Sequence, residues 1–116
     1  MGQPDLSFLY QFTKGNESKI KRYIGMFLQG APSIISAMQK SLAGSDFANF
    51  SIQAHSLKPQ AEFMGLSELK GVLVQLEEQS KSDHPDTVQL QRALDQVKQM
   101  FEQARPVLEQ KVAELG

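Results

Sequence analysis

Apolar side chains recur every three or four positions along nearly the whole of this chain, and we find no convincing alternation of apolar and polar residues over five or more positions. A spacing of three or four places side chains on one face of an α-helix, whereas a half-buried strand needs a period of two. The pattern therefore predicts an all-α fold. Because short isolated helices are only marginally stable in water, the apolar faces of the helices must pack against one another.

Turn and capping residues divide this pattern into helices. Proline is favoured in the first turn of a helix, glycine just after the last turn, and serine, asparagine or aspartate at the N-cap. On these signals Gly30 ends one helix and Pro32 begins the next, so we expect a break after Gln29. The predicted helices cover about 4–13, 17–29, 32–42, 46–64, 67–79 and 86–115.

The last predicted helix contains Pro106, which removes the amide that would bond the carbonyl of Glu102. We expect a bend there or a break near Arg105. Short loops between successive helices favour antiparallel neighbours, and four long amphipathic segments can bury their apolar stripes together. The predicted architecture is an antiparallel four-helix bundle with a short extra N-terminal helix.

Length and composition narrow the function classes. A chain of 116 residues, 41% hydrophobic and 22% charged, fits one compact domain over residues 1–116. The formal charge of −1 gives no basic field for nucleic acid. The chain has no cysteine and no apolar run near the roughly 20 residues that span a bilayer. We therefore expect a cytoplasmic protein without a nucleic-acid or membrane partner, and without a metal site of its own.

His55 lies on the polar side of the predicted helix 46–64. At about 100° per residue it is well around the helix from the apolar face, in a polar group with Ser51, Lys58 and Glu62. Side chains three apart meet on a helix surface, so His55 and Lys58 form an adjacent imidazole and ammonium. The apolar face consists of Phe47, Phe50, Ala54, Leu57, Ala61 and Met64.

The run Ala54-His55-Ser56-Leu57-Lys58, followed by Ala61 and Met64-Gly65-Leu66, resembles the signature of histidine phosphotransfer (HPt) domains. The order and lengths of the predicted helices agree with that family over nearly the whole chain. The resemblance implies a helical bundle with the histidine on an exposed face. It also implies a phosphorelay intermediate, which takes a phosphoryl group from the aspartyl phosphate of a receiver domain and passes it to another receiver.

In this family the roles would fall on named residues of the chain. His55 would be the phosphoacceptor, because a neutral imidazole is a competent nucleophile, and Lys58 would balance the phosphoryl charge. Ungapped counting places Glu77 at a family position that often carries a polar residue facing the histidine. The partners implied are response-regulator receiver domains and a hybrid sensor kinase. A divalent cation would belong to the receiver, and the chain would lack kinase activity because it has no glycine-rich phosphate loop.

The chain departs from the family at Pro59, where glycine is usual. Proline has no amide to bond the carbonyl of His55, so we expect a kink or a widened turn between these residues, and the departure puts partner fit in doubt. Apolar residues beyond His55 on the helix wheel form a candidate docking patch. The residues assigned to partner docking are Ile52, Ser56, Pro59, Glu62 and Phe63.

Simpler explanations exist for each of these residues. A lone surface histidine is usually just solvated, as we expect for His84 in its loop, and Lys58 could pair with Glu62 four residues on. Phe63 and Ile52 could pack against the first helix or a widened core. The alternative from another class is a non-catalytic helical interaction module, a pseudo-HPt domain that binds receiver or kinase domains, and Pro59 is the feature that favours it.

Overall fold

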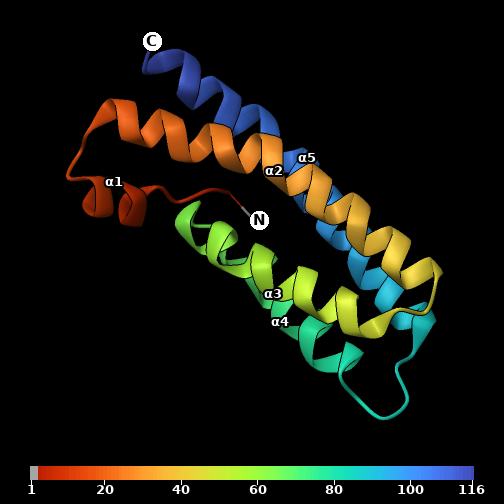
Figure 1. The fold of residues 1–116 in the computed structure, drawn as a ribbon. Helices are drawn as coiled ribbons and strands as arrows, with labels where there is room; N and C mark the ends of the chain where they lie inside the picture. The colour runs from red at the N-terminus through yellow and green to blue at the C-terminus, as the bar shows by residue number, and fades with distance from the viewer. Residues whose placement is uncertain (1–2) are drawn as a thin grey trace.

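The computed structural model describes residues 3–116, and these residues form five α-helices and no strands. The all-α prediction is confirmed. The molecule is elongated, with extents of 46 × 23 × 21 Å, and its four longer helices lie along the long axis (Figure 1). The helices are α1 (Ser7–Thr13), α2 (Glu17–Ala43), α3 (Phe47–Phe63), α4 (Ser67–Ser80) and α5 (Thr87–Glu114).

Short polar side chains begin three of these helices, as the sequence predicts. The side chain of Asn16 accepts a hydrogen bond from the amide of Lys19 at the start of α2, and Asp46 accepts one from the amide of Asn49 at the start of α3. Asp86 accepts from two amides at the start of α5. Each side chain satisfies amides that have no partner inside the helix, which fixes where the helix begins.

The predicted break between Gln29 and Pro32 is wrong. Gly30 and Pro32 both lie inside α2, an uninterrupted helix of 27 residues. Gly30 does not adopt the positive φ of a helix-ending glycine. An uninterrupted helix keeps the buried side chains on both sides of Pro32 in one stripe. The stabilisation from burying them offsets the loss of the hydrogen bond that proline removes. This stripe contains Ile20, Ile24, Phe27, Ala31, Ile35, Met38 and Leu42.

The other two helix prolines also leave their helices continuous. α3 remains α-helical from Phe47 to Phe63, so the widened turn expected between His55 and Pro59 is absent. α5 continues through Pro106 to Glu114, so the break expected near Arg105 is absent as well. The rings of Pro59 and Pro106 are both exposed. On an exposed face, water can hydrogen-bond the carbonyls that lack a helical donor.

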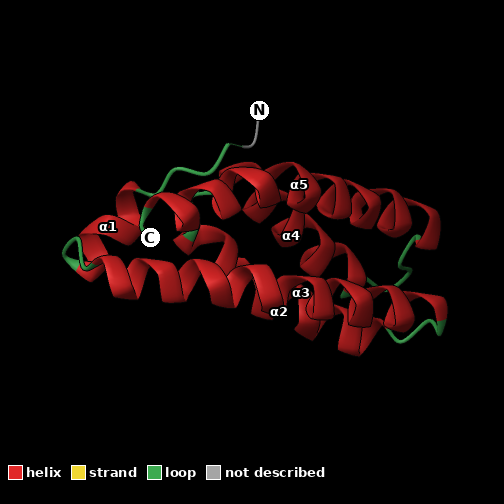
Figure 2. Ribbon diagram, turned by 90° about the horizontal axis from the view of Figure 1, so that it is seen from above, coloured by secondary structure: helices red, strands yellow, loops and turns green. Residues whose placement is uncertain are grey.

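The four long helices surround a common apolar core. α2 packs against α3 and α5, and α4 packs against the same two helices, so each long helix has two neighbours (Figures 1 and 2). Side chains from all four, among them Phe27, Phe50, Leu73 and Leu94, are at most 1% exposed. The buried stripe of α3 includes Ala54 and Leu57, which lie on either side of His55 in the sequence and turn it outward.

The short helix α1 covers the end of the molecule where α2 begins (Figure 1). Leu9 is fully buried there, and the segment before α1 crosses the turn between α3 and α4, where the amide of Asp5 donates to the carbonyl of Gly65. Gly65 has a φ of 65°, which glycine adopts without strain. A Cβ atom at this position would lie 1.8 Å from the carbonyl oxygen of Asp5, so the close crossing requires glycine.

Candidate functional site

His55 projects into solvent from the middle of α3. Its side chain is 67% exposed, while Ala54 and Leu57 are fully buried and hold this turn of the helix against the core. The ring is therefore accessible to a partner protein, and its backbone is fixed by packing.

Glu77 on α4 brings the polar residues of the site together. Its Oε2 atom lies 3.1 Å from Nδ1 of His55, and its Oε1 atom accepts a hydrogen bond from the ammonium of Lys58. A third partner, Lys81, donates from Nζ to Oε2 at 3.1 Å. The structure thus places three residues that the sequence had singled out, His55, Lys58 and Glu77, within one hydrogen-bonded cluster.

The cations around Glu77 determine its ionisation. The hydrogen bond from Lys58 is the main cause that lowers the pKa of Glu77 to about 2, with smaller contributions from Lys81 and His55, while burial opposes the shift. The Glu77 side chain is only 12% exposed, which limits screening of these contacts by water. Glu77 is consequently a carboxylate at neutral pH.

The carboxylate in turn determines which ring nitrogen of His55 carries the proton. An ionised carboxylate can only accept a hydrogen bond, so Nδ1 of His55 must be the donor in its contact with Glu77. The lone pair of the neutral ring is then on Nε2, and no hydrogen bond among residues 3–116 occupies that atom. The geometry presents a nucleophilic nitrogen to solvent, with an oriented ring behind it.

Lys81 is a residue of the site that the sequence pattern did not single out. It is the C-cap of α4, four residues after Glu77, and its side chain is 62% exposed. With Ser51, Ile52, His55 and Glu77 it lines a shallow hollow of about 250 Å³. The spacing of Glu77 and Lys81 is a sequence signal for this ion pair, but only the packing of α4 on α3 places it beside His55.

Two details of the expected polar face differ in the structure. Ser51 is 4% exposed and belongs to the wall of the hollow, not to the open surface. Lys58 pairs with Glu77 and not with Glu62, whose carboxylate instead accepts from Lys70 of α4 at 3.0 Å. Both ion pairs connect α3 with α4.

The residues assigned to docking do not share one environment. Ser56 and Pro59 are exposed on α3, and Ile52 is 64% exposed beside the hollow. Phe63, in contrast, is half-buried at the far end of α3 and stacks on Tyr23 with ring centroids 5.6 Å apart. It also contacts the rings of Phe8 and Phe12 on α1. Phe63 therefore packs against the first helix, as the simpler explanation for this residue predicted.

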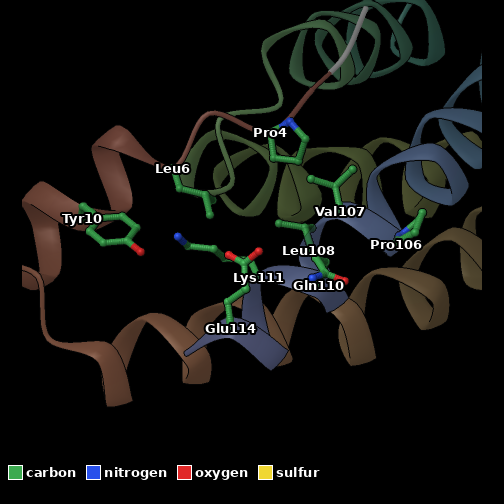
Figure 3. A pocket seen from close by; sticks show the side chains of 9 residues that line it. All are labelled: Pro4, Leu6, Tyr10, Pro106, Val107, Leu108, Gln110, Lys111 and Glu114. Atoms are coloured by element: carbon green, nitrogen blue, oxygen red, sulfur yellow. The ribbon is translucent and has the colours of Figure 1, made fainter. Parts of the chain in front are cut away.

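A larger cavity of about 580 Å³ lies elsewhere, between the N-terminal segment and the last turns of α5 (Figure 3). Its walls include Leu6, Tyr10 and Val107, and the ammonium of Lys111 lies 5.2 Å from the centre of the Tyr10 ring. None of the site residues lines it. Across residues 3–116, no three histidine, cysteine or acidic side chains are grouped so that they could hold a metal ion.

One comparison with known proteins gives a result. The family model described as Hpt domain matches residues 22–106, which include His55 and every residue around it named above. No curated protein and no solved structure matches the chain at a significant level. In the described part of the chain, none of the helices has the length and apolar character needed to cross a membrane.

Proposed function

This chain belongs to the Hpt domain family, and from that premise we propose that His55 is the residue that carries the phosphoryl group. Membership implies a histidine phosphotransfer role in a phosphorelay. The observation that supports His55 as the acceptor is the exposed ring whose Nδ1 atom is held by Glu77 at 3.1 Å. The other histidine, His84, lies in the loop before α5 and has no such partner among the described residues.

The proposed step needs no proton transfer at the ring. Nε2 attacks the phosphorus of an aspartyl phosphate in a receiver domain, a nitrogen–phosphorus bond forms, and the bond between phosphorus and the aspartyl oxygen breaks. The receiver's aspartate leaves as a carboxylate, and Nδ1 keeps its proton. Transfer to a second receiver reverses these bond changes. The chain supplies a positioned nucleophile, which is an entropic contribution to the rate.

Lys58 would stabilise the charge of the phosphoryl group. Its side chain is 22% exposed and is already held beside the ring by Glu77, so little ordering is needed when the group arrives. An ammonium is a compact cation with three donors and can contact Glu77 and a phosphoryl oxygen together. Lys81, attached to the same carboxylate, is the second cation of the proposed site.

Receiver domains are the partners that the Hpt family implies, and we propose that they dock around His55. Ile52, Ser56 and Pro59 border the ring on α3 and would contact the receiver, and Glu62 would lie at the edge of that interface. Phe63 would act there through the aromatic cluster that it forms with α1 and α2. The divalent cation of the reaction would belong to the receiver, and a hybrid sensor kinase would be the original phosphoryl source.

The scaffold within this proposal is the antiparallel four-helix bundle with a short N-terminal helix that the sequence predicts. This arrangement is supported by the helix contacts, because α2 and α4 each pack against both α3 and α5. A cytoplasmic location belongs to the same proposal, since the expected partners are phosphorelay proteins.

One observation favours a second candidate, a pseudo-Hpt domain that binds receiver or kinase domains without transferring phosphate. Pro59, one turn after His55, places an exposed ring where the family usually has glycine. A ring at that position could hinder the close approach that transfer requires while still permitting weaker binding.

Phosphorylation with a receiver distinguishes the two candidates. The purified protein is incubated with a phosphorylated receiver, beside His55→Gln and the matched control His84→Gln. We expect an acid-labile, alkali-stable phosphoryl group on the wild type and on His84→Gln, and none on His55→Gln. A receiver that binds the wild type but never phosphorylates it would establish the pseudo-Hpt alternative, and label on His55→Gln would overturn the assignment of His55.

A further inference from the structure

The exposed side of α1 carries large apolar rings and no charge. None of the seven residues of α1 is charged, and its inner side is held by Leu9, which is fully buried. On the outer side the rings of Phe8 and Phe12 are 47% and 53% exposed, and their centroids are 6.3 Å apart. Exposed apolar side chains that gather in one place mark a contact surface, whereas single ones do not.

This apolar surface continues onto the first turns of α2, where two cations border it. Lys19, Arg22 and Met26 are three and four residues apart, so they lie on one side of the helix. All three are exposed, and together with Phe12 they line a hollow of about 390 Å³. The side chain of Met26 is 59% exposed. We call the set Phe8, Phe12, Lys19, Arg22 and Met26 the end surface.

The local charge differs from the charge of the whole chain. Residues 14–22 contain four of the 12 lysines and arginines with Glu17 as their only acid, although the chain has a formal charge of −1. Among residues 3–116, neither Lys19 nor Arg22 forms an ion pair. The carboxylate of Asp5, just before α1, accepts hydrogen bonds within its own turn. The two cations of the end surface are therefore available to an anionic partner.

We propose that the end surface binds the surface of a membrane that contains anionic lipids. Phe8, Phe12 and Met26 would enter the boundary between headgroups and acyl chains, while Lys19 and Arg22 would reach the lipid phosphates with their long side chains. An acidic protein would attract the same cations. We favour the membrane because the cations lie beside the apolar group, as the phosphate layer lies beside the acyl layer, and because shallow insertion of protruding rings requires no matching pocket.

Such a contact differs from a membrane span. The expectation of no membrane partner came from the lack of a long apolar run and from the net charge, and neither property describes a local surface. The end surface lies where α1 covers one end of the molecule (Figures 1 and 2). Phe63, which contacts Phe8, follows His55 by eight residues, or about 12 Å along α3. Membrane contact by the end surface does not depend on phosphorylation of His55.

Vesicle sedimentation with the full chain measures the contribution of the cations. The vesicles consist of phosphatidylcholine with about 40% phosphatidylglycerol, or with none, and we expect at least about tenfold stronger binding to the anionic ones, weakened by salt. Lys19→Gln combined with Arg22→Gln should lower binding about twentyfold, because each cation near an anionic surface contributes about fivefold. The matched control removes two exposed cations elsewhere, Lys40→Gln with Arg92→Gln, and should lower binding less than about twofold.

Insertion of the apolar side chains is measured separately. The chain has no tryptophan, so Phe8→Trp introduces a single indole whose emission should shift to shorter wavelengths on anionic vesicles as it leaves water. Val88, which is 61% exposed in the first turn of α5, provides the control, and Val88→Trp should not shift. Phe8→Gln combined with Met26→Gln should weaken binding about tenfold, while Val88→Gln should leave it unchanged. Circular dichroism verifies that each variant is folded.

The outcomes distinguish the membrane from other partners. No binding of the wild type to anionic vesicles would overturn the proposal. Binding that needs Lys19 and Arg22 but leaves the emission of Phe8→Trp unchanged would also overturn it, because charge alone would explain it. If vesicles do not bind and Phe8→Gln with Met26→Gln weakens docking of a receiver, the end surface is a protein interface and the membrane proposal is wrong. Failure of a receiver to phosphorylate His55 would overturn the proposed function and leave vesicle binding as support for the end surface.

Discussion

At the scale of single residues, the site is organised around the two oxygens of one carboxylate. Oε1 of Glu77 holds Lys58, whereas Oε2 is shared between His55 and Lys81. The two lysines differ in freedom, because the side chain of Lys58 is 22% exposed and that of Lys81 is 62% exposed. In the proposed transfer, Lys58 would therefore be held in place before a phosphoryl group arrives, while the more exposed Lys81 would lose more freedom at that moment.

This difference predicts an order of effects for the two lysines. Lys58→Ala should lower the rate of phosphoryl transfer from a receiver about tenfold, because it removes a cation that is already positioned, although solvent weakens the contribution. Lys81→Ala should lower the rate only about two- to threefold. The rates are measured by rapid mixing with a phosphorylated receiver.

The control for both lysine variants is Lys40→Ala, which removes an exposed ammonium from the last turn of α2 and should leave the rate unchanged. Far-ultraviolet circular dichroism verifies that each variant is folded. Unchanged kinetics for Lys58→Ala would remove the role given to this residue, and a larger effect of Lys81→Ala would reverse the order argued from exposure.

At the scale of elements, local signals located the capped helix starts well, whereas the effects of the helix prolines were predicted wrongly. Asn16, Asp46 and Asp86 cap helices where the sequence predicts, because a cap depends on a side chain and amides two or three residues away. Pro32 and Pro106 were expected to interrupt helices and do not. Whether a proline interrupts a helix depends on how much apolar surface the helix buries on both sides of it. That burial depends on the neighbouring helices and not on the local sequence.

The same division between local and tertiary information applies to the site. The outward position of His55 and its proximity to Lys58 follow from helical spacing within one element. The contact with Glu77 could be anticipated only from family resemblance, since it joins residues 22 positions apart. Lys81 was not anticipated at all, because its place beside the ring depends on how α4 packs against α3.

The turn between α3 and α4 gives the prediction at this scale. Gly65→Ala should destabilise the protein by about 2 kcal/mol, because alanine is strained at positive φ and its Cβ atom would overlap the backbone of Asp5. Gly71→Ala is the matched control. Gly71 lies exposed inside α4, where a Cβ atom would meet open space, so alanine there should stabilise the protein by about 0.5 to 1 kcal/mol.

Urea unfolding gives the free energy of unfolding of both glycine variants. Hydrogen exchange at the amide of Asp5 reports whether the N-terminal segment still crosses the turn. Faster exchange is expected only in Gly65→Ala. If the two variants had equal stability, the close crossing would not be what requires glycine at this turn.

At the scale of the whole molecule, one continuous core runs between the four long helices, and α1 adds a smaller aromatic cluster at one end. The core side chains from α2, α3, α4 and α5 belong to one cluster of contacts. The rings of Phe8 and Phe12 on α1 are 47% and 53% exposed, so this cluster is only partly removed from water. The helices should therefore unfold together, while loss of a contact in the end cluster should cost less.

A phenylalanine can be replaced by alanine both in the shared core, at Phe50, and in the end cluster, at Phe12. Phe50→Ala should lower the free energy of unfolding by about 3 to 5 kcal/mol, because Phe50 is fully buried in the core. Phe12→Ala should lower it by about 1 to 2 kcal/mol, through lost aromatic contacts with Tyr23 and Phe63. Urea unfolding followed by circular dichroism and by tyrosine fluorescence should give coincident transitions in the wild type and in Phe12→Ala. Two separated transitions, or a larger loss from Phe12→Ala, would mean that the end cluster and not the shared core holds the helices together. His55 would then lie on a less rigid helix than the proposed transfer role requires.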